Sequence, residues 1–78
     1  MPRLRLLGPA RDAAGVASDD VPGSSVTEVL RHARLRYGDD FGALLEVSQV
    51  WLNGEPVPTE THVGPDDEIA VLPPVSGG

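Results

Sequence analysis

The chain has 78 residues, 40% of them hydrophobic, which is a composition typical of one small globular domain and not of a disordered segment. Twelve acidic residues against six basic ones give a net charge of −6, which disfavours nucleic acid as a partner and suits either a partner with a basic docking surface or solubility alone. The chain contains no cysteine, which excludes disulfides and thiolate metal sites, and no apolar run reaches the roughly 18 to 20 residues of a membrane span, so we expect a cytoplasmic protein without a metal site.

The N-terminal segment predicts a strand, a helical turn and a second, weaker strand. Apolar and basic residues alternate over residues 3–7 (RLRLL), which is the period of a half-buried strand, and a Gly-Pro pair ends it. Residues 10–15 (ARDAAG) predict one helical turn closed by its glycine. Residues 16–22 predict a strand that pairs with the first one as a hairpin with a wide loop.

The clearest predicted element is a helix that begins at Ser25. Ser25 and Glu28 are spaced as a capping box, in which each side chain satisfies the other residue's backbone N–H. Gly38 ends this helix, and residues 39–47 are expected to form a short irregular or helical connection. Apolar residues at helical spacing form one stripe along the helix: Val26, Val29, Leu30, Ala33 and Tyr37.

The C-terminal half predicts a hairpin and a last strand. An Asn-Gly pair at residues 53–54 supplies the two positive-φ residues of a tight type I′ turn. Before the turn, Val50 and Leu52 share one face of the strand and Trp51 points to the other. Two prolines limit the strand after the turn to a short edge piece, and residues 68–72 (EIAVL) predict the last strand.

The predicted order is strand, strand, helix, strand, short strand, strand. One main helix packed across one face of a mixed sheet of about five strands buries both the helix stripe and that sheet face. With the first and last strands parallel at the centre, this architecture is the α+β β-grasp, or ubiquitin-like, fold. We expect residues 1–72 to form its globular domain and residues 73–78 to form an extended C-terminal tail.

The sequence contains no evident catalytic constellation. The two histidines, His32 and His62, fall on different predicted elements, and we expect both to be ordinary surface side chains. There is no glycine-rich phosphate loop and no Ser-His-acid spacing. All six basic side chains are arginines, so no side chain can form a Schiff base or accept an isopeptide bond. We therefore expect the chain not to be an enzyme on its own.

Three blocks of the sequence resemble the MoaD/ThiS family of ubiquitin-like sulfur carriers, and above all the small subunits of molybdopterin synthase. LLGPARDAAG resembles that family's first strand and the arginine-acid-x-x-glycine turn after it, here Arg11, Asp12 and Gly15. VWLNGEPV resembles its strand and Asn-Gly turn, and DDEIAVLPPVSGG resembles its closing strand and tail. Two positions depart from the family, because Asp66 stands where glycine is common and Leu7 where phenylalanine is frequent.

The resemblance implies a reaction at the C-terminal carboxylate of Gly78. A carboxylate is ionised at neutral pH and is a poor electrophile, so it needs activation. In this family an E1-like enzyme uses ATP to adenylate the terminal glycine, and a sulfur donor protein supplies the sulfur of a thiocarboxylate. The carrier lends that sulfur to the larger catalytic subunit of molybdopterin synthase, in a heterotetramer that makes the dithiolene of the molybdenum cofactor. The implied carrier holds no permanent cofactor of its own.

The residues before Gly78 suit this chemistry. Two terminal glycines lack Cβ atoms and can thread a narrow channel, and two prolines stiffen the exit from the sheet. Val75 is a candidate apolar anchor, and Ser76 offers a hydroxyl for positioning. The expected site consists of the reacting residue, its neighbour and four tail residues that contact partners: Gly78, Gly77, Pro73, Pro74, Val75 and Ser76.

The sheet face away from the helix carries a candidate docking patch. Alternation along the strands places Leu7, Trp51 and Leu72 on that face, near the point at which the tail leaves the sheet. An exposed tryptophan beside leucines is typical of a docking surface. The alternative is that residues 39–47 shield Trp51 from solvent.

The sequence leaves other functions open. The same sulfur chemistry serves thiamine, cysteine and tungsten-cofactor synthesis. The chain is alternatively a ubiquitin-like modifier that is conjugated through Gly78 to lysines of other proteins. A third possibility is a β-grasp interaction module whose tail has no role.

Overall fold

The computed structural model describes residues 1–74, so the predicted tail residues Val75, Ser76, Gly77 and Gly78 lie outside the described part of the chain. The described residues form three helices and five strands, in an order that matches the predicted one apart from the added helices. In chain order the elements are β1 (Arg3–Leu6), α1 (Pro9–Ala14), β2 (Ser18–Asp20), α2 (Val26–Tyr37), α3 (Asp39–Val47), β3 (Gln49–Leu52), β4 (Glu55–Pro56) and β5 (Glu68–Leu72).

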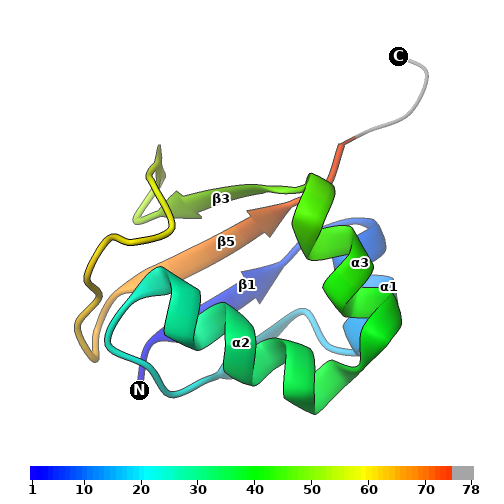
Figure 1. Cartoon of the computed structure of the whole chain (residues 1–78), viewed down its shortest axis with the longest axis horizontal. Coiled ribbons are helices and arrows are strands. Elements are labelled where there is room, and N and C mark those ends of the chain that lie inside the picture. Colours follow the sequence, from blue (N-terminus) through cyan, green and yellow to red (C-terminus); the bar gives the residue numbers. More distant parts are fainter. Residues whose placement is uncertain (75–78) are drawn as a thin grey trace.

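The five strands form one mixed sheet in the order β2-β1-β5-β3-β4. The first and last strands lie side by side and parallel, and the remaining pairs are antiparallel. Figure 1 shows β1, β5 and β3 next to one another, with the helices gathered on one side of them. The predicted α+β β-grasp architecture is therefore confirmed.

The strand register sorts the apolar residues onto the face that the helices cover. Leu4 pairs with Ile69 and Leu6 with Val71, and all four side chains are fully or almost fully buried. Val50 pairs with Val71 on the same face but is only partly buried, because it lies nearer the β4 edge of the sheet. The helices and the loop before α2 complete the core with Ala10, Val21, Val26, Val29, Ala33 and Phe41.

The main helix, α2, begins as predicted, but its N-terminal cap is built differently. The Ser25 hydroxyl accepts a hydrogen bond from the backbone N–H of Glu28 at 3.2 Å, which is the first half of a capping box. The Glu28 carboxylate instead accepts a hydrogen bond from the hydroxyl of Ser24 at 2.9 Å. Glu28 therefore fixes the segment that leads into the helix and also places a negative charge in its first turn.

Two segments are more regular, and one is shorter, than the sequence indicates. Residues 39–47 form the full nine-residue helix α3, whose Phe41 packs edge-on against Tyr37 with ring centroids 5.1 Å apart. The segment at residues 10–15 becomes the six-residue helix α1, which Gly15 ends in the left-handed conformation. The weak strand at residues 16–22 is reduced to the three residues of β2.

The turn between β3 and β4 has the predicted geometry and also holds the start of β5. Asn53 and Gly54 both have positive φ angles, 50° and 86°, as a type I′ turn requires. The Asn53 side chain accepts a hydrogen bond from the backbone N–H of Glu68 at 2.9 Å and donates one to the carboxylate of Asp67 at 3.0 Å. The backbone N–H of Gly64, followed by Asn53, lowers the pKa of Asp67 below its usual value. Asp66 does not have a positive φ, so it adopts no left-handed turn.

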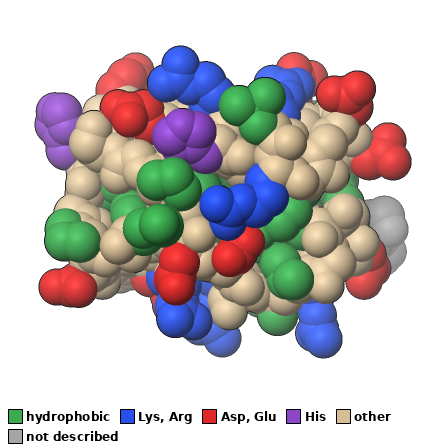
Figure 2. Space-filling model, turned by 90° about the horizontal axis from the view of Figure 1, so that it is seen from below, with side chains coloured by type: hydrophobic (Ala, Val, Ile, Leu, Met, Phe, Trp, Pro, Cys, Tyr) green, Lys and Arg blue, Asp and Glu red, His purple; other side chains and the backbone are tan. Residues whose placement is uncertain are grey.

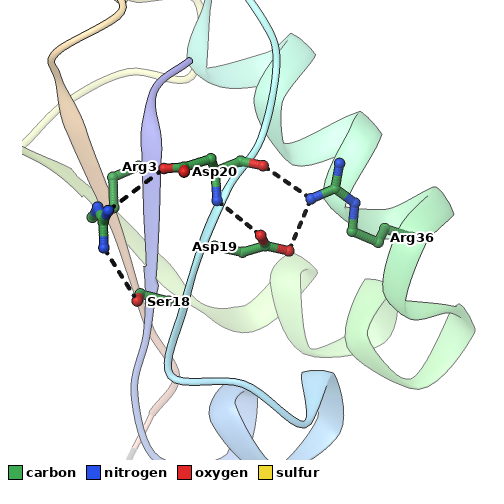
Figure 3. A network of polar contacts seen from close by, with 5 residues as sticks. All are labelled: Arg3, Ser18, Asp19, Asp20 and Arg36. Atoms are coloured by element: carbon green, nitrogen blue, oxygen red, sulfur yellow. Dashed lines mark hydrogen bonds and ion pairs between the residues drawn. The ribbon is translucent and has the colours of Figure 1, made fainter.

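Opposite charges on β2 and its neighbours hold this edge strand from both sides of the sheet (Figure 3). On the helix side, Asp19 accepts hydrogen bonds from the Tyr37 hydroxyl and from Arg36 at 2.8 Å, and Arg36 also donates to the backbone carbonyl of Asp20 at 3.0 Å. On the other side, the Arg3 guanidinium lies 3.7 Å from the Asp20 carboxylate. The hydrogen bond from Tyr37, and then the one from Arg36, lowers the pKa of Asp19. Burial, together with the bond to Asp19, raises the pKa of Tyr37 to about 12.

This arrangement predicts the titration of Tyr37, which is the only tyrosine of the chain. Its folded pKa of about 12 lies above the unfolded value of about 10, so the neutral phenol stabilises the fold below pH 10 and this contribution is lost as the pH rises to about 12. Replacing Asp19 with Asn removes the negative charge that opposes phenolate formation, so the pKa of Tyr37 should fall towards 10. Phenolate absorbance during an alkaline titration measures both values, and an unchanged pKa in the folded Asp19→Asn variant would contradict the assignment.

Candidate docking surface and tail exit

The tail begins at the end of β5, the central strand of the sheet. β5 lies between β1 and β3 and ends at Leu72, which Pro73 and Pro74 follow directly. Because β1 and β5 are parallel, this exit lies at the end of the sheet away from the first residues of the chain, as Figure 1 shows. Proline fixes φ near −65°, so the two prolines restrict the direction in which the chain leaves β5.

Trp51 lies on the sheet face away from the helices, which we call the open face. It pairs with Ala70 of β5, which in turn pairs with Arg5 of β1, and all three alternate with residues that face the core. The indole N–H of Trp51 donates to the side-chain oxygen of Gln49 at 3.2 Å, and the ring remains partly exposed. α3 packs mainly against α1 and α2, so residues 39–47 do not shield Trp51.

The predicted patch residues lie at one end of the open face. Leu72 pairs with Gln49, two residues from Trp51 on the same strand, and is partly exposed. Leu7 directly follows Leu6, the last residue of β1, which pairs with Val71. The exposed fraction of Leu7 is 39%. The structure therefore places Leu7 and Leu72 beside the tail exit, and Trp51 on the same face opposite Ala70, two residues before the end of β5.

The rest of the open face is polar, and its charges are paired. Arg3 lies 3.7 Å from Asp20 and its guanidinium donates to Ser18 at 3.5 Å, as Figure 3 shows. Arg5 lies 3.7 Å from Glu68 on the neighbouring strand. These exposed pairs lie on β2, β1 and the start of β5, whereas Trp51, Ala70 and Leu72 lie towards β3 and the tail exit, beside the polar side chain of Gln49. We call these two parts the ionic half and the apolar half of the open face.

The structure adds a residue that the sequence analysis missed at the tail exit. Val47 ends α3, is 62% exposed, and lines a shallow pocket together with Gln49, Leu72, Pro73 and Pro74. The sequence assigns Val47 only to a connecting segment, and no periodicity links it to the tail. Its place follows from the tertiary packing that brings the end of α3 beside the end of β5, which no local pattern specifies.

The histidines lie away from this exit and bind the loop before α2. His32 Nδ1 lies 2.8 Å from the carbonyl of Pro22, and His62 Nδ1 lies 3.4 Å from the carbonyl of Ser24. Each ring therefore presents an Nδ1–H to a backbone oxygen, as expected for ordinary structural side chains. Within residues 1–74 no group of three or more possible metal ligands occurs, and no helix there is long and apolar enough to cross a membrane.

Comparison with known proteins places these features in a family. The family model described as "ThiS family" matches residues 4–78. SAMP1 (small archaeal modifier protein 1) from Haloferax volcanii is 30% identical, with 99% of this chain and 98% of that chain covered and a TM-score of 0.78. A chain of the complex of subunits 1 and 2 of the molybdopterin-converting factor from Helicobacter pylori is 27% identical, with 99% and 97% covered and a TM-score of 0.71.

A third structure supports the fold alone. A chain of the BexX/CysO complex from Amycolatopsis orientalis is 22% identical, with all of both chains covered and a TM-score of 0.85. A search of curated protein sequences found no match.

Proposed function

The chain belongs to the ThiS family of ubiquitin-like sulfur carriers and modifiers, and we propose that it carries sulfur as a thiocarboxylate at Gly78 for synthesis of the molybdopterin dithiolene. The observation that best supports this proposal is the continuity of the last central strand with a Pro-Pro-Val-Ser-Gly-Gly tail. A tail that starts at a fixed point of a rigid sheet can be presented to a partner without unfolding the domain.

The proposed chemistry needs an activating partner, because the Gly78 carboxylate is a poor electrophile. An E1-like enzyme would use ATP to form the acyl adenylate and release pyrophosphate. The outer sulfur of a persulfide on a donor protein would then attack the acyl carbon and displace AMP. A thiol would reduce the resulting acyl disulfide, which frees the thiocarboxylate and leaves the donor in a disulfide with that thiol. The chain has no cysteine, so the terminal carbonyl is its one group suited to hold the sulfur.

The tail would act through its extended length and through the contacts of its side chains with a partner. Residues 73–78, when extended, span roughly 20 Å at about 3.3 to 3.6 Å per residue, which is enough to enter a buried site on another protein. Pro73 and Pro74 would lower the entropy lost when a partner grips the tail. We assign Val75 to an apolar notch of the partner and Ser76 to a hydrogen bond within the channel, and Gly77 would allow the close passage of Gly78.

The apolar half of the open face would dock the larger catalytic subunit of molybdopterin synthase. Leu7, Val47 and Leu72 lie beside the tail exit and Trp51 lies near them on the open face, so a partner that receives the tail would cover them. Tryptophan contributes strongly to interfaces because it buries a large rigid surface. In the Helicobacter pylori structure, the related chain occurs in a complex of subunits 1 and 2, which supports a partner of this kind.

A ubiquitin-like modifier is the second candidate function. The similarity to a protein named small archaeal modifier protein 1 favours it, because conjugation and sulfur transfer both begin with adenylation of the terminal glycine. Conjugation would produce amide-linked adducts of Gly78 with lysines of other proteins, whereas sulfur carriage would produce a thiocarboxylate.

Intact mass spectrometry tests the proposed function. The full chain is incubated with ATP, an activating enzyme and a sulfur donor, and we expect a gain of about 16 Da as one oxygen is replaced by sulfur. A variant that lacks Gly77 and Gly78 is the control and should gain nothing. Failure of the full chain to gain this mass, or an equal gain in the truncated variant, would contradict the proposal.

Replacement of Trp51 with Asp tests the docking surface. We expect affinity for the larger catalytic subunit, measured by calorimetry, to fall at least about tenfold, because a charge would be buried where the indole packs. Leu35→Asp is the matched control, because Leu35 is 79% exposed on α2, away from the open face. Its affinity should change less than about twofold. Equal affinities of the two folded variants would disprove the assignment.

A further inference from the structure

A second surface lies on the helix side of the sheet. Three of the six arginines of this acidic chain, Arg31, Arg34 and Arg36, lie within α2. Figure 2 views the molecule from the side on which α2 lies and shows arginine side chains next to hydrophobic ones. A groove of about 370 Å³ separates α2 from the end of α3 and is lined by Thr27, Leu30, Arg31, Arg34, Leu45, Glu46 and Thr59.

The groove has an apolar floor and a fixed end. Leu30 of α2 and Leu45 of α3 are both partly buried against the core and leave part of their surface in the groove. At one end, the backbone N–H and the hydroxyl of Thr27 both donate to the carbonyl of Thr59, at 2.9 and 2.8 Å. These bonds tie the loop after β4 to the first turn of α2, so the groove is formed before any ligand binds.

Arg34 is held at the rim of the groove by a glycine. A Cβ atom built on Gly42 would lie 2.3 Å from Nε of Arg34, so the arginine side chain lies against α3 only because residue 42 has none. The guanidinium also lies 3.5 Å from the Glu46 carboxylate, with 49% of the Arg34 side chain and 70% of the Glu46 side chain exposed. Gly42 lies inside a helix, where glycine is less favourable than alanine, so its position is explained by contact with Arg34 and not by helix stability.

Arg31 supplies an unpaired positive charge at the same groove. It is exposed, and within residues 1–74 no acidic side chain forms a salt bridge with it. Two guanidiniums therefore face one carboxylate around an apolar floor, on a chain whose net charge is −6. Arginine binds carboxylates through paired N–H donors, so this local excess of positive charge favours an acidic ligand.

We propose that the groove between α2 and α3 binds an extended segment of a partner protein that carries both apolar and acidic side chains. An apolar side chain of the segment would pack between Leu30 and Leu45, and a carboxylate would bind Arg31 and Arg34. α2 and α3 cover the face of the sheet opposite Trp51, so the segment would bind on the other side of the sheet from the open face.

An NMR titration of the full isotope-labelled chain tests the proposal with a defined probe, the peptide acetyl-Asp-Leu-Glu-Leu-Asp-amide. We expect amide shifts confined to the groove, at Thr27, Leu30, Arg31, Leu45 and Glu46. A peptide in which Lys replaces each acidic residue should bind at least about tenfold more weakly. The absence of shifts at millimolar peptide, or shifts on the open face instead, would overturn the proposal.

Three variants separate recognition by the groove from net charge and from folding. Arg31→Glu should lower the affinity for the acidic peptide about tenfold. Arg11→Glu, an equal charge change on the exposed surface of α1, should lower this affinity less than about twofold. Gly42→Ala should retain or raise the thermal stability, because alanine favours the helix. The same variant should bind the acidic peptide more weakly, because Arg34 is displaced. Equal losses in Arg31→Glu and Arg11→Glu, or unchanged binding in Gly42→Ala, would refute the site. If the wild-type chain forms dimers and Arg31→Glu abolishes them, a second copy of the chain fills the groove instead.

Discussion

The parallel pairing of β1 with β5 is the constraint on which the rest of the structure depends. The two ends of the domain meet at the centre of the sheet, from Arg3 beside Glu68 to Leu6 beside Val71. β2 is attached to β1 and β3 to β5, with β4 added beyond β3, and the core side chains of both central strands are buried beneath the helices. Because β5 is central, the last residues before the tail are fixed by neighbours on both sides, and the start of the tail is fixed with them.

The alternation of the strands then gives the molecule two unlike sides. On one side the helices bury the apolar residues and leave an arginine-rimmed groove between α2 and α3. On the other side paired charges and a partly exposed Trp51 share an uncovered sheet face that ends at the tail exit. The two sides differ in chemistry, so the fold offers a partly apolar sheet face on one side and a charged groove on the other.

The strands and the main helix were predictable because their signals are local. The alternation of apolar and polar residues predicts β1, β3 and β5, the Asn-Gly pair predicts the turn, and Ser25 predicts the start of α2. What the sequence did not reveal depends on contacts between distant segments. The exposed Val47 beside Pro73 is one case, and the contact of Arg34 with Gly42 across two helices is another. Gly42 appears in the sequence only as an unfavourable residue in a helix.

The central claim is that the end of the sheet around the tail exit is the surface that engages the partner receiving the tail. The most direct measurement is an NMR spectrum of the labelled chain with the unlabelled larger catalytic subunit of molybdopterin synthase. The account predicts that the Trp51 indole and the amides of Ala70 and Leu72 lose intensity on binding, while amides on the exposed side of α2 do not. Losses confined to α2, with the Trp51 indole unchanged, would contradict it.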